Sequence, residues 1–125
     1  MINNMKSNLM KKIYYLKTCD TCKKILKMIP LDGFILQEIK SESITVNQLN
    51  KMKGLAGSYE SLFSRRAKKY KPMDLKSEIL SEDDYKQLIL EEYTFLKRPV
   101  IIINDYIFIG NSKKNVESLL QFIEK

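Results

Sequence analysis

The amino-acid sequence predicts an α/β protein: a β-α-β unit, a helical insert, and a β-β-α unit around a four-stranded mixed sheet. Three observations support this order. Short runs rich in β-branched and aromatic residues occur near both ends of the chain, which is typical of strands. Apolar residues recur at helical spacing after the two cysteines, which are separated by two residues, and again near the carboxyl end. The stretch between the terminal units, 43–96, has helical rather than strand patterns.

The first unit is expected to be strand, helix, strand. Residues 12–17 (KIYYLK) form the first predicted strand, which ends at Thr18. A helix is predicted from Thr21 until Pro30 stops it, and residues 34–39 (FILQEI) form the second strand. Because a crossover helix joins them, the two strands should be parallel.

The insert is expected to contain three helices, at 45–57, 59–70 and 81–96. The predicted breaks are at Gly54, Gly57 and Pro72. The third helix is the clearest, because Ser81 can cap it and acidic residues fill its first turn. Its predicted apolar face consists of Tyr85, Leu88, Ile89, Tyr93 and Leu96.

The last unit is expected to be a hairpin followed by a helix. Residues 99–103 (PVIII) and 106–110 (YIFIG) are the predicted antiparallel strands, joined by a tight turn. Beyond Asn111 an amphipathic helix is predicted from the stripe Val116, Leu119, Leu120 and Ile123.

Length and composition favour one domain. With 125 residues the chain can bury its own core, so we expect a flexible tail at 1–11 and a single domain at 12–125. No apolar run approaches the about 18 residues of a membrane helix, and no secretory signal pattern is present. We therefore expect a cytoplasmic monomer without a membrane partner.

The charge and the missing histidines narrow the chemistry. The net charge of +7 would suit an acidic or nucleic-acid partner, but nearly all cations are lysines spread along the chain, and no stacking motif accompanies them. Direct nucleic-acid binding is therefore an alternative that we do not favour. The absence of His excludes Cys-His pairs, Ser-His triads and His-containing zinc sites.

The only two cysteines, Cys19 and Cys22, form a CxxC between the first strand and the first helix. Cys19 would lie at the helix amino terminus, where unpaired N–H groups and the helix dipole stabilise a thiolate. Cys22, one turn further on, could attack a disulfide formed at Cys19. The sequence thus predicts Cys19 as nucleophile and Cys22 as resolving thiol, with positive potential from Lys17, Lys23 and Lys24.

Two other interpretations of the cysteines remain open. A zinc site needs two further ligands, which one chain without His or additional Cys lacks, so no metal is expected. Two inert buried cysteines are the other alternative, although the intervening Asp20 and Thr21 suggest an exposed turn. A CxxC at the strand-to-helix junction of a β-α-β unit favours a thioredoxin-like redox motif. Such a fold predicts a cis-proline opposite the cysteines, and Pro99 is the candidate.

Four segments together resemble the ArsC/Spx family of thioredoxin-fold proteins: CDTC, LFSRRAKKY, LKRPVIII and FIGNSKKNVESLLQFI. The resemblance covers about residues 12–124 and implies a helical insert. The family contains glutaredoxin-dependent arsenate reductases and Spx transcription regulators. It is expected to need no bound cofactor, with glutathione, glutaredoxin or thioredoxin as reductant.

The resemblance also implies residue roles. Cys19 matches the arsenate-attacking cysteine of the reductases and the first redox cysteine of the regulators. Cys22 matches only the regulators and some uncharacterised relatives, since typical reductases lack a second cysteine there. Arg98 matches the arginine before the cis-proline, where a guanidinium can bind an oxyanion or a thiolate. Arg66 matches a family arginine, and Arg65 stands where that segment usually has Thr; with Thr18 they are the candidate substrate-binding residues.

Two functions follow from these roles. The first is an arsenate-reductase-like thiol–disulfide oxidoreductase that uses the CxxC. Against arsenate itself, the chain has Ile109, Gly110 and Asn111 in the region where the reductases carry a third arginine. The alternative is an Spx-like redox-sensing regulator that binds the RNA polymerase α subunit and catalyses nothing.

Overall fold

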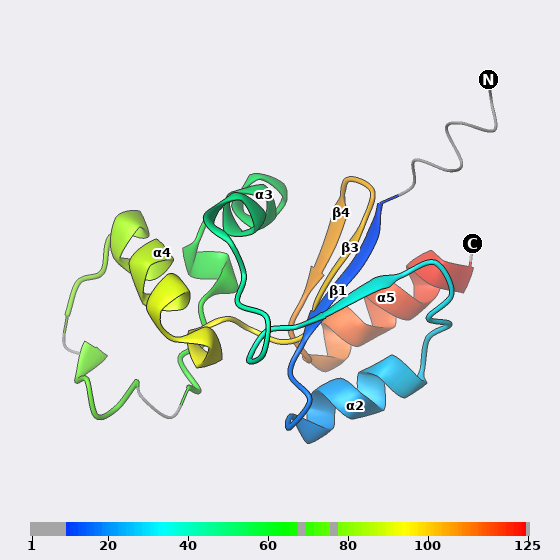
Figure 1. Ribbon diagram of the computed structural model, residues 1–125, viewed down its shortest axis with the longest axis horizontal. Coiled ribbons are helices and arrows are strands. Elements are labelled where there is room, and N and C mark those ends of the chain that lie inside the picture. Colours follow the sequence, from blue (N-terminus) through cyan, green and yellow to red (C-terminus); the bar gives the residue numbers. More distant parts are fainter. Residues whose placement is uncertain (1–9, 68–69, 76–77, 125) are drawn as a thin grey trace. The chain divides into compact units, whose positions relative to one another are not determined.

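The structure is a computed structural model that describes residues 10–67, 70–75 and 78–124 (Figure 1). Within them the chain divides into two compact units. The first combines the described residues up to Glu38 with those from Arg98 onward, and the second is Ile39–Lys97. The predicted insert, 43–96, lies within the second unit. Most of the predicted tail, 1–9, lies outside the described residues.

The first unit is built on a four-stranded mixed sheet, as predicted. Its strands are β1 (Lys11–Tyr15), β2 (Ile35–Glu38), β3 (Val100–Ile103) and β4 (Tyr106–Ile109), in the spatial order β2-β1-β3-β4. The β1–β2 pair is parallel, and the β1–β3 and β3–β4 pairs are antiparallel. Ile13 on β1 lies opposite Leu36 on β2 and Ile101 on β3.

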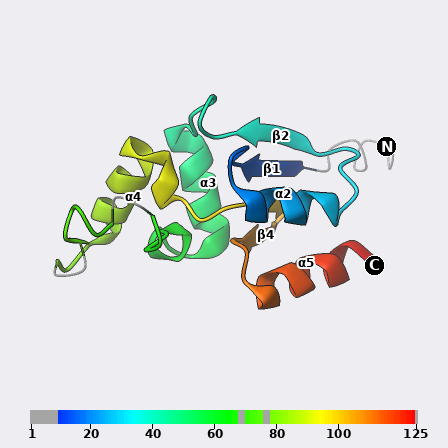
Figure 2. The same ribbon diagram turned by 90° about the horizontal axis from the view of Figure 1, so that it is seen from below.

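Two helices cover one face of this sheet, α2 (Asp20–Lys27) and α5 (Lys113–Glu124) (Figures 1 and 2). Ile25 of α2 and Leu119 of α5 belong to one buried cluster with the strand residues Ile13, Ile101 and Phe108. The rest of the predicted stripe on α5 packs against the same cluster: Val116, Leu120 and Ile123. The helical periodicity therefore identified the sheet-facing side of α5 correctly.

The first strand ends earlier than the sequence predicts. It was expected to reach residue 17, but β1 ends at Tyr15. The chain turns at Leu16, whose carbonyl oxygen accepts the backbone N–H of Cys19 at 3.1 Å. A strand-like composition continues to Lys17, but this turn removes the last two residues from the ladder.

The second unit contains α3 (Val46–Ala56) and α4 (Glu82–Glu91). Thr45 and Ser81 form capping boxes at their amino ends, which confirms the predicted cap at Ser81. Gly54 was predicted to break a helix and instead lies inside α3. The helix ends at Gly57, whose φ of 99° gives the left-handed C-cap typical of glycine.

Two helix predictions in the insert are wrong in extent. Residues 59–70 were predicted as helical, but the described part has only a 3-10 turn at Glu60–Leu62. The chain then extends, and Phe63 forms an antiparallel bridge with Leu96. Main-chain hydrogen bonding to a distant segment decided this: the carbonyl oxygen of Leu62 accepts the N–H of Lys97 at 2.8 Å.

Helix α4 is also shorter than the helix predicted at 81–96. It stops at Glu91 because Glu92 adopts an extended conformation, with φ −139° and ψ 108°. A separate 3-10 turn, Tyr93–Phe95, follows it. Tyr93 and Leu96 are therefore not on the apolar face of α4.

None of the helices among the described residues has the length and apolar character needed to cross a membrane.

Candidate functional site

The structure places the first cysteine where strand β1 passes into helix α2. Cys19 is the N-cap residue of α2 and is partly exposed. Its carbonyl oxygen accepts the N–H of Lys23 at 3.1 Å, which starts the hydrogen bonding of the helix. Cys22 lies one turn further in and is buried with 0% exposure. Both are free thiols, so this is the reduced form of the pair.

The loop before Cys19 is held by a carboxylate that the sequence analysis did not single out. The backbone N–H of Lys17 donates to Oε2 of Glu38 at 2.9 Å. Glu38 is the last residue of β2, the strand parallel to β1. The signal was available, because an acidic side chain at the carboxyl end of a neighbouring parallel strand can reach the loop after β1.

The predicted cis-proline is confirmed, since the Arg98–Pro99 peptide bond is cis. Pro99 is buried immediately before β3, and its carbonyl oxygen accepts the N–H of Gly110 at 2.8 Å. The side chain of Arg98 interacts with Cys19 through charge and hydrogen bonding. The fold thus brings residues 19 and 98, far apart in sequence, into one site within the first unit.

The environment of Cys19 favours its thiolate. Burial alone would raise the pKa of Cys19, but the backbone N–H and the thiol of Cys22 and the Arg98 guanidinium together lower it below the ordinary value. The anion is the form that these donors stabilise.

Cys22 has the opposite tendency. Burial is the main cause that raises the pKa of Cys22 to about 12, and the neighbouring Cys19 adds to it. The sequence suggested an exposed turn for the pair, and this is wrong for Cys22. Cys19 is therefore the more acidic and the more accessible of the two thiols. This difference is the one expected between a nucleophilic thiol and a second thiol that is protected from solvent.

Arg98 supplies the positive charge that acts on Cys19. Lys17, Lys23 and Lys24 are exposed, and the charged group that lowers the pKa of Cys19 is Arg98. Lysines on a solvated surface are screened by water, whereas the partly buried guanidinium lies against the thiol. The three lysines are not among the groups that lower the pKa of Cys19.

The remaining candidate residues are placed less directly. Thr18 is exposed in the turn before Cys19. Arg65 and Arg66 belong to the second unit. Arg65 donates to Glu60 Oε2 at 3.1 Å and to the Tyr85 hydroxyl at 2.9 Å, and Arg66 is exposed in a turn. The substrate-binding roles of these three residues stay predictions.

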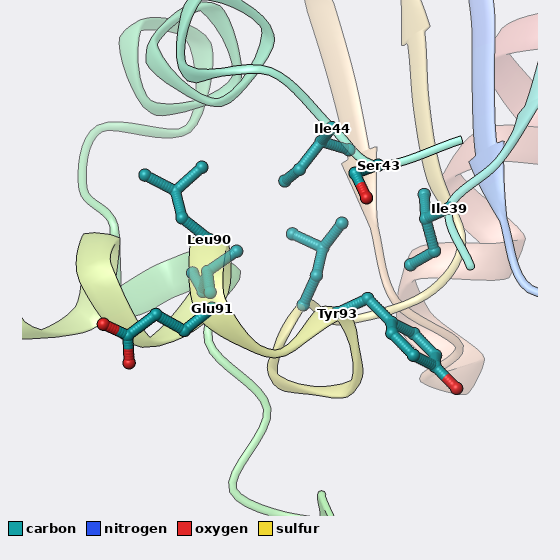
Figure 3. A pocket seen from close by; sticks show the side chains of 8 residues that line it. Ile39, Ser43, Ile44, Leu90, Glu91 and Tyr93 are labelled. Atoms are coloured by element: carbon teal, nitrogen blue, oxygen red, sulfur yellow. The ribbon is translucent and has the colours of Figure 1, made fainter. Parts of the chain in front are cut away.

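Other features of the described residues offer less chemistry. No group of three or more potential ligands could hold a metal ion in the described part of the chain. A small pocket of about 80 Å³ in the second unit is lined mainly by apolar side chains, among them Ile39, Ile44 and Leu96. Figure 3 shows that the carboxylate of Glu91 and the ring of Tyr93 point away from the isoleucines.

The four-stranded sheet and the cysteine pair at the amino terminus of α2 place the chain in the thioredoxin-like class of folds. Within that class, the model of the ArsC family matches residues 14–119, and the chain belongs to this family.

Individual relatives agree with the assignment. Global transcriptional regulator Spx 2 of Bacillus cereus is 26% identical over 113 residues, covering 86% of this chain and 85% of that protein. An arsenate reductase from Vibrio cholerae has a similar structure, with a TM-score of 0.69 and 20% identity over 90% of this chain and 97% of that one. An arsenate reductase (ArsC) related protein from Brucella melitensis gives 0.65 and 23%, over 87% and 92%. At these identities the two structures support the fold alone.

Proposed function

We propose that this chain is a cytoplasmic thiol–disulfide oxidoreductase of the ArsC family, with Cys19 as nucleophile and Cys22 as resolving thiol. The observation that carries the proposal is the difference between the two thiols. Cys19 is partly exposed with a lowered pKa, and Cys22 is buried with a raised one. Arg98 stabilises the negative charge at Cys19.

In the first step the Cys19 thiolate attacks one sulfur of a substrate disulfide. A bond forms between Sγ of Cys19 and that sulfur, the substrate S–S bond breaks, and the other substrate sulfur leaves as a thiolate. This exchange needs no further oxidant or reductant. The product is a mixed disulfide between Cys19 and half of the substrate.

In the second step Cys22 attacks Sγ of Cys19. Its proton passes to the departing thiolate, the mixed disulfide breaks, and a Cys19–Cys22 disulfide forms, so two electrons have moved from the protein to the substrate. Cys22 gains acidity at this stage, because the anionic Cys19 that helped to raise its pKa is no longer charged. The pair is therefore suited to act in this order.

An external thiol must then reduce the disulfide, and glutathione, glutaredoxin or thioredoxin has the required chemistry. An oxyanion such as arsenate could replace the disulfide as the group attacked by Cys19. Arg98 and Thr18 of the first unit are the candidate residues for binding it, and the substrate-binding roles of Arg65 and Arg66 stay predictions. No metal or other cofactor takes part in either version.

The test is mass spectrometry with thiol alkylation on wild type, Cys19→Ser and Cys22→Ser. Each protein is treated with oxidised glutathione and then returned to reduced glutathione. We expect wild type to form a reversible intramolecular disulfide. The oxidised chain should be about 2 Da lighter than the reduced chain, because two hydrogens are lost. Cys22→Ser should trap glutathione on Cys19, and Cys19→Ser should react slowly.

A wild-type chain that stays fully reduced, or that traps glutathione as readily on Cys22 as on Cys19, would contradict the proposal. A separate assay of arsenate-dependent NADPH oxidation, with glutaredoxin or thioredoxin supplied, tests the narrower activity. Turnover with arsenate would identify a reductase. Disulfide formation without that turnover leaves the thiol–disulfide function in place and removes arsenate.

The similarity to the Bacillus cereus regulator supports a second candidate, a redox-switched module that binds the RNA polymerase α subunit. In that case the same disulfide would control binding and catalyse no turnover. Immobilised RNA polymerase α subunit should retain one redox form more strongly than the other. Equal lack of retention in both redox forms would exclude this function.

A further inference from the structure

The second unit carries a groove on one side of α4 that the thiol chemistry does not use. It encloses about 330 Å³ and is lined by residues of α4 and by described residues that precede this helix; Figure 1 shows the ribbon of α4. Its apolar lining consists of Met73, Leu75, Ile79, Leu80 and Leu88. Its polar lining consists of Glu78, Asp84, Gln87 and Glu91. We call this surface the acidic groove.

The charge of the acidic groove is opposite to that of the chain. All ionisable residues that line it in the described part of the structure are carboxylates: Glu78, Asp84 and Glu91. Hydrogen bonding from Ser81 lowers the pKa of Asp84, which keeps this carboxylate ionised. The sequence shows the same asymmetry, because residues 73–92 contain seven Asp or Glu and two Lys, whereas the whole chain has a net charge of +7.

Two of the five apolar side chains that line the groove are exposed. Ile79 has 101% relative exposure and Met73 has 45%, whereas Leu75 is buried. Asp84, Leu88 and Glu91 follow one another at helical spacing along α4, so apolar and acidic groups alternate along the same wall. Exposed apolar groups with a charged rim are typical of a binding surface.

We propose that the acidic groove binds a basic, amphipathic helical segment of a partner protein. Apolar side chains of that segment would cover Ile79, Met73 and Leu88. Its Lys or Arg residues would pair with Glu78, Asp84 and Glu91. Helix-in-groove recognition combines these two contributions, and the carboxylates would select a basic helix over an acidic one.

The charge also distinguishes this partner from others. Nucleic-acid phosphates or an anionic lipid surface would meet the carboxylates and be repelled. A second copy of this basic chain has the required net charge, so self-association is the competing occupant.

The experiment uses the full-length chain in its reduced form and three fluorescent 18-residue peptides. The first is an amphipathic Leu/Lys helix, the second has the same composition in scrambled order, and the third replaces every Lys by Glu. Fluorescence anisotropy measures binding. We expect the Leu/Lys helix to bind at least tenfold more tightly than either control peptide, and to weaken with added NaCl.

Two variants locate the binding. Ile79→Ser removes the exposed apolar group, and the double substitution Glu78→Lys, Glu91→Lys reverses two of the charges. Each should weaken binding of the Leu/Lys helix at least fivefold. The matched controls Val46→Ser and Glu124→Lys change an exposed apolar residue and an exposed carboxylate outside the groove and should leave binding within twofold. Circular dichroism verifies that every variant is folded.

Failure of the Leu/Lys helix to bind, or an equal loss in the control variants, would overturn the proposal. So would concentration-dependent dimerisation in analytical ultracentrifugation that Ile79→Ser abolishes, because a second copy would then occupy the groove. These results leave the thiol–disulfide function untouched, since neither Cys19 nor Cys22 is altered.

Discussion

At the scale of single residues, Cys19 and Cys22 acquire different properties although they are two positions apart. Cys19 caps α2 at the surface, and Cys22 is buried beneath the same turn. Arg98, which precedes Pro99 and strand β3, adds a positive charge near Cys19. The motif predicts two thiols of related function, but the order in which they react depends on burial, which the motif does not contain.

Replacing Arg98 should slow the reaction of Cys19. We expect Arg98→Ala to raise the pKa of Cys19 and to reduce the rate of iodoacetamide alkylation at pH 7 several-fold, with Arg98→Lys between it and wild type. Alkylation rates measured from pH 5 to 10 give the apparent pKa. Lys27→Ala, in the last turn of α2, is the control, because an exposed lysine that far along the helix is screened. Identical profiles for Arg98→Ala and wild type would refute the role of Arg98.

The raised pKa of Cys22 should make the reduced protein less stable in alkali. A thiol whose pKa is higher in the folded state, about 12, than in the unfolded state, about 8.5, stabilises the fold below the unfolded value. This stability is lost as the pH rises from about 8.5 toward 12. Between pH 8.5 and 10.5 the loss should be about 2–3 kcal/mol.

Urea unfolding of reduced wild type and Cys22→Ala across this pH range isolates the effect, because other titrating groups are common to both proteins. The difference in unfolding free energy between them should shrink as the pH rises. A difference that is constant with pH would show that Cys22 titrates normally.

At the scale of elements, local signals predicted where several helices begin but not how far they extend. Ser81 caps α4 as expected, because a capping box depends on residues within one turn. The end of α4 at Glu91 depends on the main-chain pairing of the segments around Phe63 and Leu96. Such long-range pairing overrides a continuous helical pattern.

The two glycines of the α3 region provide a matched pair. A Cβ at Gly54 or at Gly57 would have no heavy atom within 4 Å, so only the backbone distinguishes them. Gly54→Ala should stabilise the protein by about 0.5–1 kcal/mol, because it replaces a helical glycine. Gly57→Ala should destabilise it by about 1 kcal/mol, because its φ is 99°. Chemical denaturation measures both, and effects of the same sign would contradict this account.

At the scale of the whole molecule, the first unit is assembled from both ends of the chain. β3 lies between β1 and β4, so residues from 98 onward complete the sheet begun by residues 11–38. The helices α2 and α5 share one buried cluster although a complete second unit separates them in sequence. The thiol site has the same origin, because it joins Cys19 to Arg98.

The central strand should accordingly be sensitive to truncation of its side chains. Ile101 is 1% exposed and lies between Ile13 and Phe108. Ile101→Ala should reduce the free energy of unfolding by about 2–5 kcal/mol, as expected for a cavity in a packed core. Ile79→Ala, at a fully exposed isoleucine, should change it by less than about 0.5 kcal/mol. Denaturation curves that show similar losses for the two variants would contradict the assignment of the core.

The sequence by itself determined the α/β order, the parallel pairing of the first two strands, the antiparallel pairing of the last two, the CxxC at the start of a helix, and Pro99 as the cis-proline. These depend on short patterns of polarity and on residue types that act within a few positions, and a family resemblance added the link between Cys19 and Arg98. Only the tertiary structure decided that Cys22 is buried, that Glu38 holds the loop before Cys19, and that residues 59–70 do not form a long helix. The physical reason is that burial and hydrogen bonding between distant segments are set by how the elements pack.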